Sequence, residues 1–168
     1  KRAMSIDIDN ADKVFYPDAG YTKADLVDYY QRIADQMLPL IEGRPLTLHR
    51  FPDGIDGVNF IQKSVQDHYP DWIERVTVDK EDGQITHALA ADADTLAWLV
   101  DQGTIAFHVW LSRADKPHHP DRLIFDLDPP DDGTDFAPVV AAARAVRKAL
   151  ADVGLVSYVM TTGSSGLH

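Results

Sequence analysis

The sequence contains no cysteine among its 168 residues. Disulfides and thiolate metal sites are therefore excluded, and histidine and carboxylate side chains remain as the metal ligands available. No apolar run approaches the length that spans a membrane, and no apolar signal core follows residues 1–4. We therefore expect a cytoplasmic protein that makes no use of a membrane.

Positive charge is also scarce in this chain. Lys and Arg number 16 against 27 Asp and Glu, which leaves a formal net charge of −11. Phosphate contacts need local positive charge, so any site for nucleic acid must depend on a local basic face rather than on the overall field. With 45% hydrophobic and 26% charged residues, the chain can bury one core, and we expect a single domain over residues 1–168.

The spacing of apolar residues predicts an α+β fold with a mixed or antiparallel sheet. Three helices are expected: one from a capping box at Thr22–Asp25 to Gly43, one starting at Asp92 or Asp94, and one from Asp135 to Val153. Strand-like runs cover residues 46–50, 58–62, 75–79, 85–89, 104–111, 122–128 and 156–160. The third helix carries an apolar stripe that we expect to be buried: Phe136, Val139, Val140, Ala143, Val146, Leu150 and Val153.

Two aspartates, Asp126 and Asp128, close the apolar run at residues 122–125. Residues two apart on a strand point to the same face, so the two carboxylates would project side by side. Paired carboxylates repel each other and favour a cation, and oxygen ligands suit Mg²⁺ or Mn²⁺. The alternative is a solvated turn, because residues 129–133 read Pro-Pro-Asp-Asp-Gly.

A segment rich in glycine and serine, Thr161–His168, follows the last expected strand. Its glycines permit close approach of the backbone to a ligand, and its amides and hydroxyls can surround a phosphate. His168 would add a further phosphate contact. Most such turns bind nothing. The position of this one, a helix and a strand after the aspartates, indicates that the two motifs meet at adjacent strand ends.

Eight segments carry a family resemblance, in order along the chain: Asn10–Pro17, Gly20–Lys23, Asp28–Tyr30, Gly43–Thr47, Arg50–Gly54, Ala106–Val109, Leu123–Pro129 and Gly163–His168. With these segments the chain resembles the primase-like polymerase domain attached to bacterial ligase D, of the archaeo-eukaryotic primase superfamily. The resemblance implies an RRM-like catalytic core that adds nucleotides, preferring ribonucleotides, to broken DNA ends in non-homologous end joining. It also implies a nucleoid-associated bacterial protein whose partners are nucleoside triphosphates, DNA ends with a 5′-phosphate, Ku and an ATP-dependent DNA ligase.

The resemblance also assigns roles to individual residues. Asp126 and Asp128 match two of three carboxylates that bind two Mn²⁺ or Mg²⁺ ions. Contacts to the incoming nucleotide are implied for Thr162, Ser164, Ser165, His168, His108 and Phe60. Contacts to DNA are implied for Lys13 and Lys23 at the 5′-phosphate and for Phe60 and Ile61 at a stacked base. Ile61 and Ser165 depart from the family pattern, because many relatives have an aromatic residue and a lysine there.

Each assignment has a simpler alternative. The two lysines can be ordinary solvated side chains, Phe60 a core aromatic, and His108 a hydrogen-bonded structural residue of its strand. The family's third metal aspartate lies beyond His168, so we expect the chain to be an incomplete domain with little or no activity by itself.

Two further functions remain open at this stage. One is a module that binds DNA ends without chemistry, which would need the lysines but not the aspartates. The other is a metal-dependent glycosyltransferase that uses the Asp-x-Asp motif. The second predicts a parallel nucleotide-binding sheet near the N-terminus, whereas the first half of this chain is rich in hairpin signals.

Overall fold

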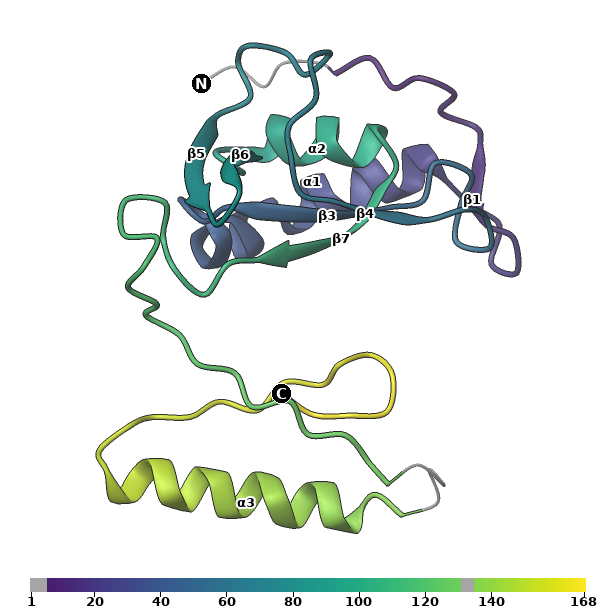
Figure 1. The fold of residues 1–168 in the computed structure, drawn as a ribbon. Coiled ribbons are helices and arrows are strands. Elements are labelled where there is room, and N and C mark those ends of the chain that lie inside the picture. The colour runs from purple at the N-terminus through teal and green to yellow at the C-terminus, as the bar shows by residue number, and fades with distance from the viewer. Residues whose placement is uncertain (1–5, 131–134) are drawn as a thin grey trace. The chain divides into compact units, whose positions relative to one another are not determined.

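A computed structural model describes residues 6–130 and 135–168 (Figure 1). It divides into two compact units, one ending at Asp121 and the other running from Arg122 to His168. Residues 1–4 and the end of the turn expected at 129–133 lie outside the described residues. The expectation of one domain over residues 1–168 is not decided by this division and stays a prediction.

The first unit contains three small sheets in which every strand pair is antiparallel. The strands are β1 (Val14–Tyr16), β2 (Tyr21–Thr22), β3 (Leu46–Arg50), β4 (Phe60–Gln62), β5 (Arg75–Lys80), β6 (Gly83–Ala88) and β7 (Thr104–Val109). The sheets have the strand orders β1-β2, β4-β3-β7 and β5-β6. Among the described residues there is therefore no parallel pair, and the sheet that a glycosyltransferase would need near the N-terminus is not found there.

Two helices, α1 (Lys23–Ile41) and α2 (Ala93–Asp101), pack against β3 and β7 in the first unit (Figure 1). The capping box forms as expected, because the Asp25 amide donates to the Thr22 hydroxyl and the Thr22 amide donates to the Asp25 carboxylate. Asp92 caps α2 by accepting from the Thr95 amide at 2.8 Å. Both helices begin where the sequence places them.

The core of the first unit lies between these helices and one face of the sheet β4-β3-β7. Leu46 and Leu48 of β3 are buried with residues from both helices, and Phe107 of β7 packs on Tyr30. Because side chains alternate along a strand, Thr47 and His49 fall on the opposite face of β3. The α+β class with antiparallel pairing is thereby confirmed.

The second unit consists of α3 (Ala137–Asp152) and extended segments on either side of it. The strands expected at 122–128 and 156–160 are wrong: the described residues of this unit form only the isolated bridges Leu127–Leu167 and Thr161–Leu167. A strand needs a neighbour that continues its hydrogen bonds, and the apolar sequence alone cannot supply one.

The buried stripe expected on α3 is also largely wrong. Of its seven residues only Val139 is buried, while Phe136 and Val153 are 45% and 71% exposed. Helical periodicity identifies which side of a helix is apolar, but another element has to cover that side before it is buried. No helix in the described ranges is long and apolar enough to cross a membrane.

Candidate functional site

The first unit has an open surface hollow beside the start of α1. Its volume is about 490 Å³ and its lining residues are Asn10, Ala11, Asp12 and Lys13. The Lys13 amide donates to the Asn10 carbonyl at 2.9 Å and closes this turn. Asn10 has a φ of 52°, in the left-handed region that asparagine tolerates better than most residues. The turn is held against α1 because the Lys23 amide donates to the Lys13 carbonyl at 2.8 Å.

Lys13 lies at the edge of this hollow and is the more accessible of the two candidate lysines. Its side chain is 38% exposed, and its ammonium contacts the Pro52 carbonyl and the Asp53 carboxylate, both at 2.7 Å. The loop that supplies these partners lies close to β1 because Gly54 has φ +88°, and a Cβ there would be 3.0 Å from the Phe15 carbonyl oxygen. A side chain at position 54 would push the loop away from Lys13.

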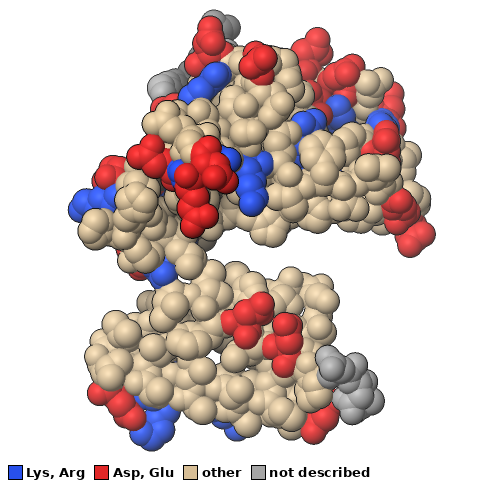
Figure 2. All heavy atoms as spheres, viewed as in Figure 1, with Lys and Arg blue, Asp and Glu red and all other residues tan. Residues whose placement is uncertain are grey.

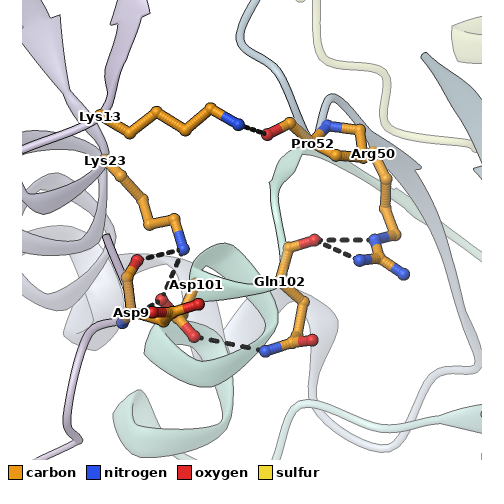
Figure 3. A network of polar contacts seen from close by, with 7 residues as sticks. All are labelled: Asp9, Lys13, Lys23, Arg50, Pro52, Asp101 and Gln102. Carbon is orange, nitrogen blue, oxygen red and sulfur yellow. Dashed lines mark hydrogen bonds and ion pairs between the residues drawn. The ribbon is translucent and has the colours of Figure 1, made fainter. Parts of the chain in front are cut away.

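Lys23 is buried instead of solvated. Its ammonium donates to the Asp101 carboxylate at 2.9 Å and to the Asp9 carbonyl at 2.5 Å, and the side chains of Lys23 and Asp101 are only 9% and 7% exposed (Figure 3). The alternative of an ordinary surface lysine is therefore wrong for Lys23. Its amide lies against the turn at residues 10–13, so both candidate lysines come from one small region of the unit.

Phe60 and Ile61 are both exposed, at 43% and 50%, so neither is a core residue. Arg50 lies beside the Phe60 ring, with its guanidinium carbon 5.4 Å from the ring centroid. The guanidinium also donates to the Gln102 carbonyl and to Gln62. An exposed ring supported by a fixed cation is a suitable platform for stacking a nucleic-acid base.

His108 lies on β7, and its side chain is exposed. It is next to His49 on the outer face of the sheet, with ring centroids 6.2 Å apart. Thr47 of β3 is the direct cross-strand neighbour of His108. His49 is held by Asn59 at 2.9 Å and by the Phe51 ring at 4.4 Å. Two imidazoles thus share the face of this sheet opposite the core.

The second unit brings the aspartate pair and the Gly/Ser segment together. Leu127 and Leu167 exchange two backbone hydrogen bonds of 2.9 Å, which aligns the segment containing Asp126 and Asp128 with the end of the loop. Asp126 lies 3.4 Å from the ring nitrogen Nε2 of His168. A Cβ on Gly166 would be 2.8 Å from an Asp128 carboxylate oxygen. The two motifs therefore meet as expected, although at an isolated bridge and not at adjacent strand ends.

The loop itself is closed around Thr162. The Thr162 hydroxyl contacts the amides of Ser164 and Gly166 at 3.3 and 3.2 Å, and Gly163 takes the left-handed φ of +80°. Ser164 and Ser165 are exposed at the tip of the loop. His168 is partly buried, and its Nδ1 atom is buried without a hydrogen-bond partner among the described residues. A polar atom in that state is available for a ligand or a proton.

The aspartate pair of the second unit contains the candidate metal ligands. Asp126 and Asp128 are both exposed, and their oxygen atoms have the chemistry that Mg²⁺ and Mn²⁺ prefer. Among residues 6–130 and 135–168, no group of three or more potential ligands is close enough together to hold an ion. The two carboxylates are therefore suitable ligand types for a divalent ion, and phosphate or water would have to complete the coordination shell.

Three residues of these sites were not singled out from the sequence: Asn10, Arg50 and Asp101. Asn10 and Arg50 lie within segments that carry the family resemblance, so a signal for them existed. Asp101 lies in no such segment, and its pairing with Lys23 spans 78 residues. That pairing becomes visible only in the folded chain.

Comparisons with known proteins converge on one family. A family model described as "LigD, primase-polymerase domain" matches residues 22–168. The chain is 42% identical over 171 residues to the multifunctional non-homologous end joining DNA repair protein LigD of Mycobacterium tuberculosis, covering 97% of this chain and 22% of that protein. It is 32% identical over 157 residues to the bifunctional non-homologous end joining protein LigD of Bacillus subtilis, covering 94% and 25%.

A solved structure agrees with these sequence matches. It is the polymerase domain from Mycobacterium tuberculosis ligase D in complex with DNA, with a TM-score of 0.89, 40% identity, and coverage of 98% of this chain and 60% of that one. The chain thus spans about a fifth of the length of the first curated relatives it matches.

Proposed function

This chain belongs to the LigD primase-polymerase family, and from that premise we propose that it acts as a nucleotidyltransferase domain that extends DNA ends during non-homologous end joining. The relatives named above come from bacteria, and we place this protein with DNA in the bacterial cytoplasm. Its proposed partners are nucleoside triphosphates, DNA ends with a 5′-phosphate, Ku and a DNA ligase. The similar solved structure is a complex with DNA, which supports the DNA partner.

The observation that carries the proposal is the pairing of Asp126 and Asp128 with the loop that ends at His168. The two carboxylates would hold Mg²⁺ or Mn²⁺, ions that activate a 3′-hydroxyl and neutralise charge on the transferring phosphate when bound. The Thr162 loop would position the triphosphate through its amides and hydroxyls. His168 would donate a hydrogen bond to a phosphate oxygen while its contact with Asp126 fixes the ring.

The first unit would bind the DNA. Lys13, beside the hollow at residues 10–13, supplies positive charge for a 5′-phosphate, and Asn10 adds an amide on the same wall. Phe60 would stack on a base, with Ile61 beside it as a smaller apolar contact. His108 would reach the nucleotide from the outer face of β7. The side chains in these assignments are exposed or partly exposed.

The metal assignment is tested with Asp126→Asn and Asp128→Asn. Each variant should lose Mn²⁺ binding in the presence of a nucleoside triphosphate, measured by calorimetry. In a version of the protein that continues beyond His168, each should also lower metal-dependent nucleotide addition by about a hundredfold or more. Asp152→Asn is the matched control, since Asp152 is an exposed residue of the same unit whose partner is Lys148. Unchanged Mn²⁺ binding in either variant would show that these carboxylates are not the ligands.

The phosphate assignment is tested with Lys13→Ala. A gapped duplex with a 5′-phosphate should bind the unaltered protein more tightly than its dephosphorylated twin, and the advantage should shrink in Lys13→Ala and at raised salt, since both reduce counterion release. Lys80→Ala, on the β5-β6 hairpin, is the control. In a version of the protein that continues beyond His168, DNA-end binding without nucleotide addition would favour the alternative of a binding module without chemistry.

A further inference from the structure

The buried ion pair of Lys23 and Asp101 connects three parts of the first unit that are distant in sequence. Asp101 is the last residue of α2, Lys23 is the first residue of α1, and Asp9 precedes the hollow. One carboxylate oxygen of Asp101 accepts from the Lys23 ammonium at 2.9 Å and from the Asp9 amide at 3.1 Å. The Lys23 ammonium in turn contacts the Asp9 carbonyl, as Figure 3 shows. This arrangement fixes the ammonium in one place.

A lysine fixed in this way differs from a surface lysine in what it can offer a ligand. An ammonium group has three N–H donors. Among the described residues, Lys23 uses two of them, on Asp9 and Asp101. Ordering a free lysine side chain costs up to about 2 kcal/mol of rotamer entropy, and here that cost is already met in the folded protein. A contact from the remaining N–H to a phosphate would then cost no further side-chain freedom.

The charge of Asp101 decides which kind of role it can have. A carboxylate beside the ammonium cancels most of its long-range attraction for an anion. If charge were the main contribution of Lys23, Asp101 would weaken phosphate binding, and its removal would strengthen it. If the fixed orientation of the Lys23 ammonium is the main contribution, removal of Asp101 releases the ammonium and weakens phosphate binding. The two contacts to Asp9 and the burial of both side chains favour the second case, in which Asp101 fixes the orientation of the Lys23 ammonium.

We infer that Asp101 is a positioning residue for 5′-phosphate recognition, which holds the Lys23 ammonium with one N–H free for the phosphate. This inference rests on the proposed function, because it assumes that a DNA 5′-phosphate binds beside the hollow. The same residue extends the network toward the stacking residue: the Gln102 side chain donates to Asp101 at 3.3 Å, and the Gln102 carbonyl accepts from Arg50. Asp101 itself touches neither DNA nor nucleotide in this scheme.

The main experiment measures one ratio, the affinity for a 5′-phosphorylated gapped duplex divided by the affinity for its dephosphorylated twin. Asp101→Asn keeps an oxygen acceptor but removes the charge that holds Lys23. The ratio should fall about fivefold to tenfold, as expected when the ordering of one lysine has to accompany binding. General loosening of the fold would weaken both duplexes alike and leave the ratio unchanged. Asp79→Asn, on the β5-β6 hairpin, is the matched control.

A second variant tests whether Asp101 acts through Lys23. In a Lys23→Met background the ratio should already be low, and adding Asp101→Asn should change it no further. An unchanged or increased ratio in the Asp101→Asn single variant would overturn the inference. If the unaltered protein itself shows no preference for the phosphorylated duplex, the proposed phosphate site and this inference both fail. A preference that Asp101→Asn leaves intact removes the inference alone.

Loss of one member of a buried pair can unfold a domain, because it leaves the other charge unpaired. If the Asp101→Asn variant does not fold, a measurement on the unaltered protein tests the inference instead. The Lys23 ammonium should give a slowly exchanging ¹H–¹⁵N signal in the free protein, and this signal should shift when the phosphorylated duplex is added but not with its dephosphorylated twin. Absence of the signal, or an equal response to both duplexes, would overturn the inference.

Discussion

At the scale of single residues, Arg50 illustrates how a half-buried side chain supports an exposed one. Its guanidinium donates to the Gln102 carbonyl and to Gln62, and it lies 5.4 Å from the centre of the Phe60 ring. Burial lowers the pKa of Arg50 from its ordinary value, although an arginine remains charged at neutral pH. The planar guanidinium meets all three neighbours at once, which the point charge of a lysine cannot do.

We therefore predict that Arg50→Lys is not a conservative change. It should lower the free energy of unfolding by about 1–3 kcal/mol, since buried acceptors on Gln102 and Gln62 lose their donors. Urea denaturation measures the effect. Arg32→Lys serves as the control, because Arg32 is exposed and pairs only with Asp28 one helical turn away, and its change should stay within about 0.5 kcal/mol. Equal stability of the two variants would contradict the role given to Arg50.

At the scale of elements, α1 and α3 show opposite ways of making a helix. A capping box between Thr22 and Asp25 starts α1, and its buried residues belong to the core of the first unit. Hydrogen bonds from the Thr22 amide and hydroxyl also lower the pKa of Asp25, because they stabilise the charged carboxylate. In α3 the N-cap residue is Phe136, which makes no side-chain cap bond, although the Asp135 carboxylate just before it accepts from the Ala137 amide at 2.8 Å. Of the α3 residues, Val139 is buried.

The capping box yields a prediction for Thr22. Thr22→Ala should lower the free energy of unfolding of the first unit by about 1 kcal/mol, because the Asp25 amide loses its acceptor at the helix start. Thr22→Ser retains the hydroxyl and should restore most of that loss. Thermal unfolding followed by circular dichroism compares the three proteins. A serine variant as unstable as the alanine variant would mean that the methyl group, not the cap, stabilises this end.

At the scale of the whole chain, the net negative charge affects phosphate binding, and burial of a tyrosine affects stability at alkaline pH. The net charge is −11, and on the face shown in Figure 2 the Lys and Arg side chains form small separate groups among Asp and Glu. Phosphate binding therefore depends on individual positioned cations such as Lys13. The core of the first unit contains Tyr30, whose hydroxyl donates to the Ile105 carbonyl at 2.6 Å. Burial raises the pKa of Tyr30 to about 12.

Tyr30 leads to a prediction for alkaline solution. Tyrosine is neutral when protonated, and its pKa is higher in the folded protein than the value of about 10 in the unfolded chain. Its contribution is therefore fully present below pH 10 and is lost between pH 10 and 12, amounting to about 2–3 kcal/mol. Urea titrations across this range should show a shallower decline for Tyr30→Phe. Tyr158→Phe, at an 88% exposed position, should decline as the unaltered protein does.

The sequence by itself determined the local structure of the first unit and the chemical character of both candidate sites. Local signals determine the capping box at Thr22, the cap at Asp92 and most strand positions. These signals can be recognised in the sequence because they involve only residues that are close together along the chain. The family-specific segments also sufficed to indicate the LigD primase-polymerase family, which the comparisons bear out. The roles of Asp126, Asp128 and the nucleotide-contacting residues stay predictions.

Tertiary structure alone decided which residues are buried and which residues meet. The strands expected at 122–128 and 156–160 did not form, because an apolar run becomes a strand only when a neighbour completes its hydrogen bonds. The sequence left open that Lys23 is an ordinary surface lysine, yet it is buried against Asp101, 78 residues away. A buried charge is stable only beside its partner, and that partner is brought near by the packing of α1 on α2, which no local pattern in the chain records.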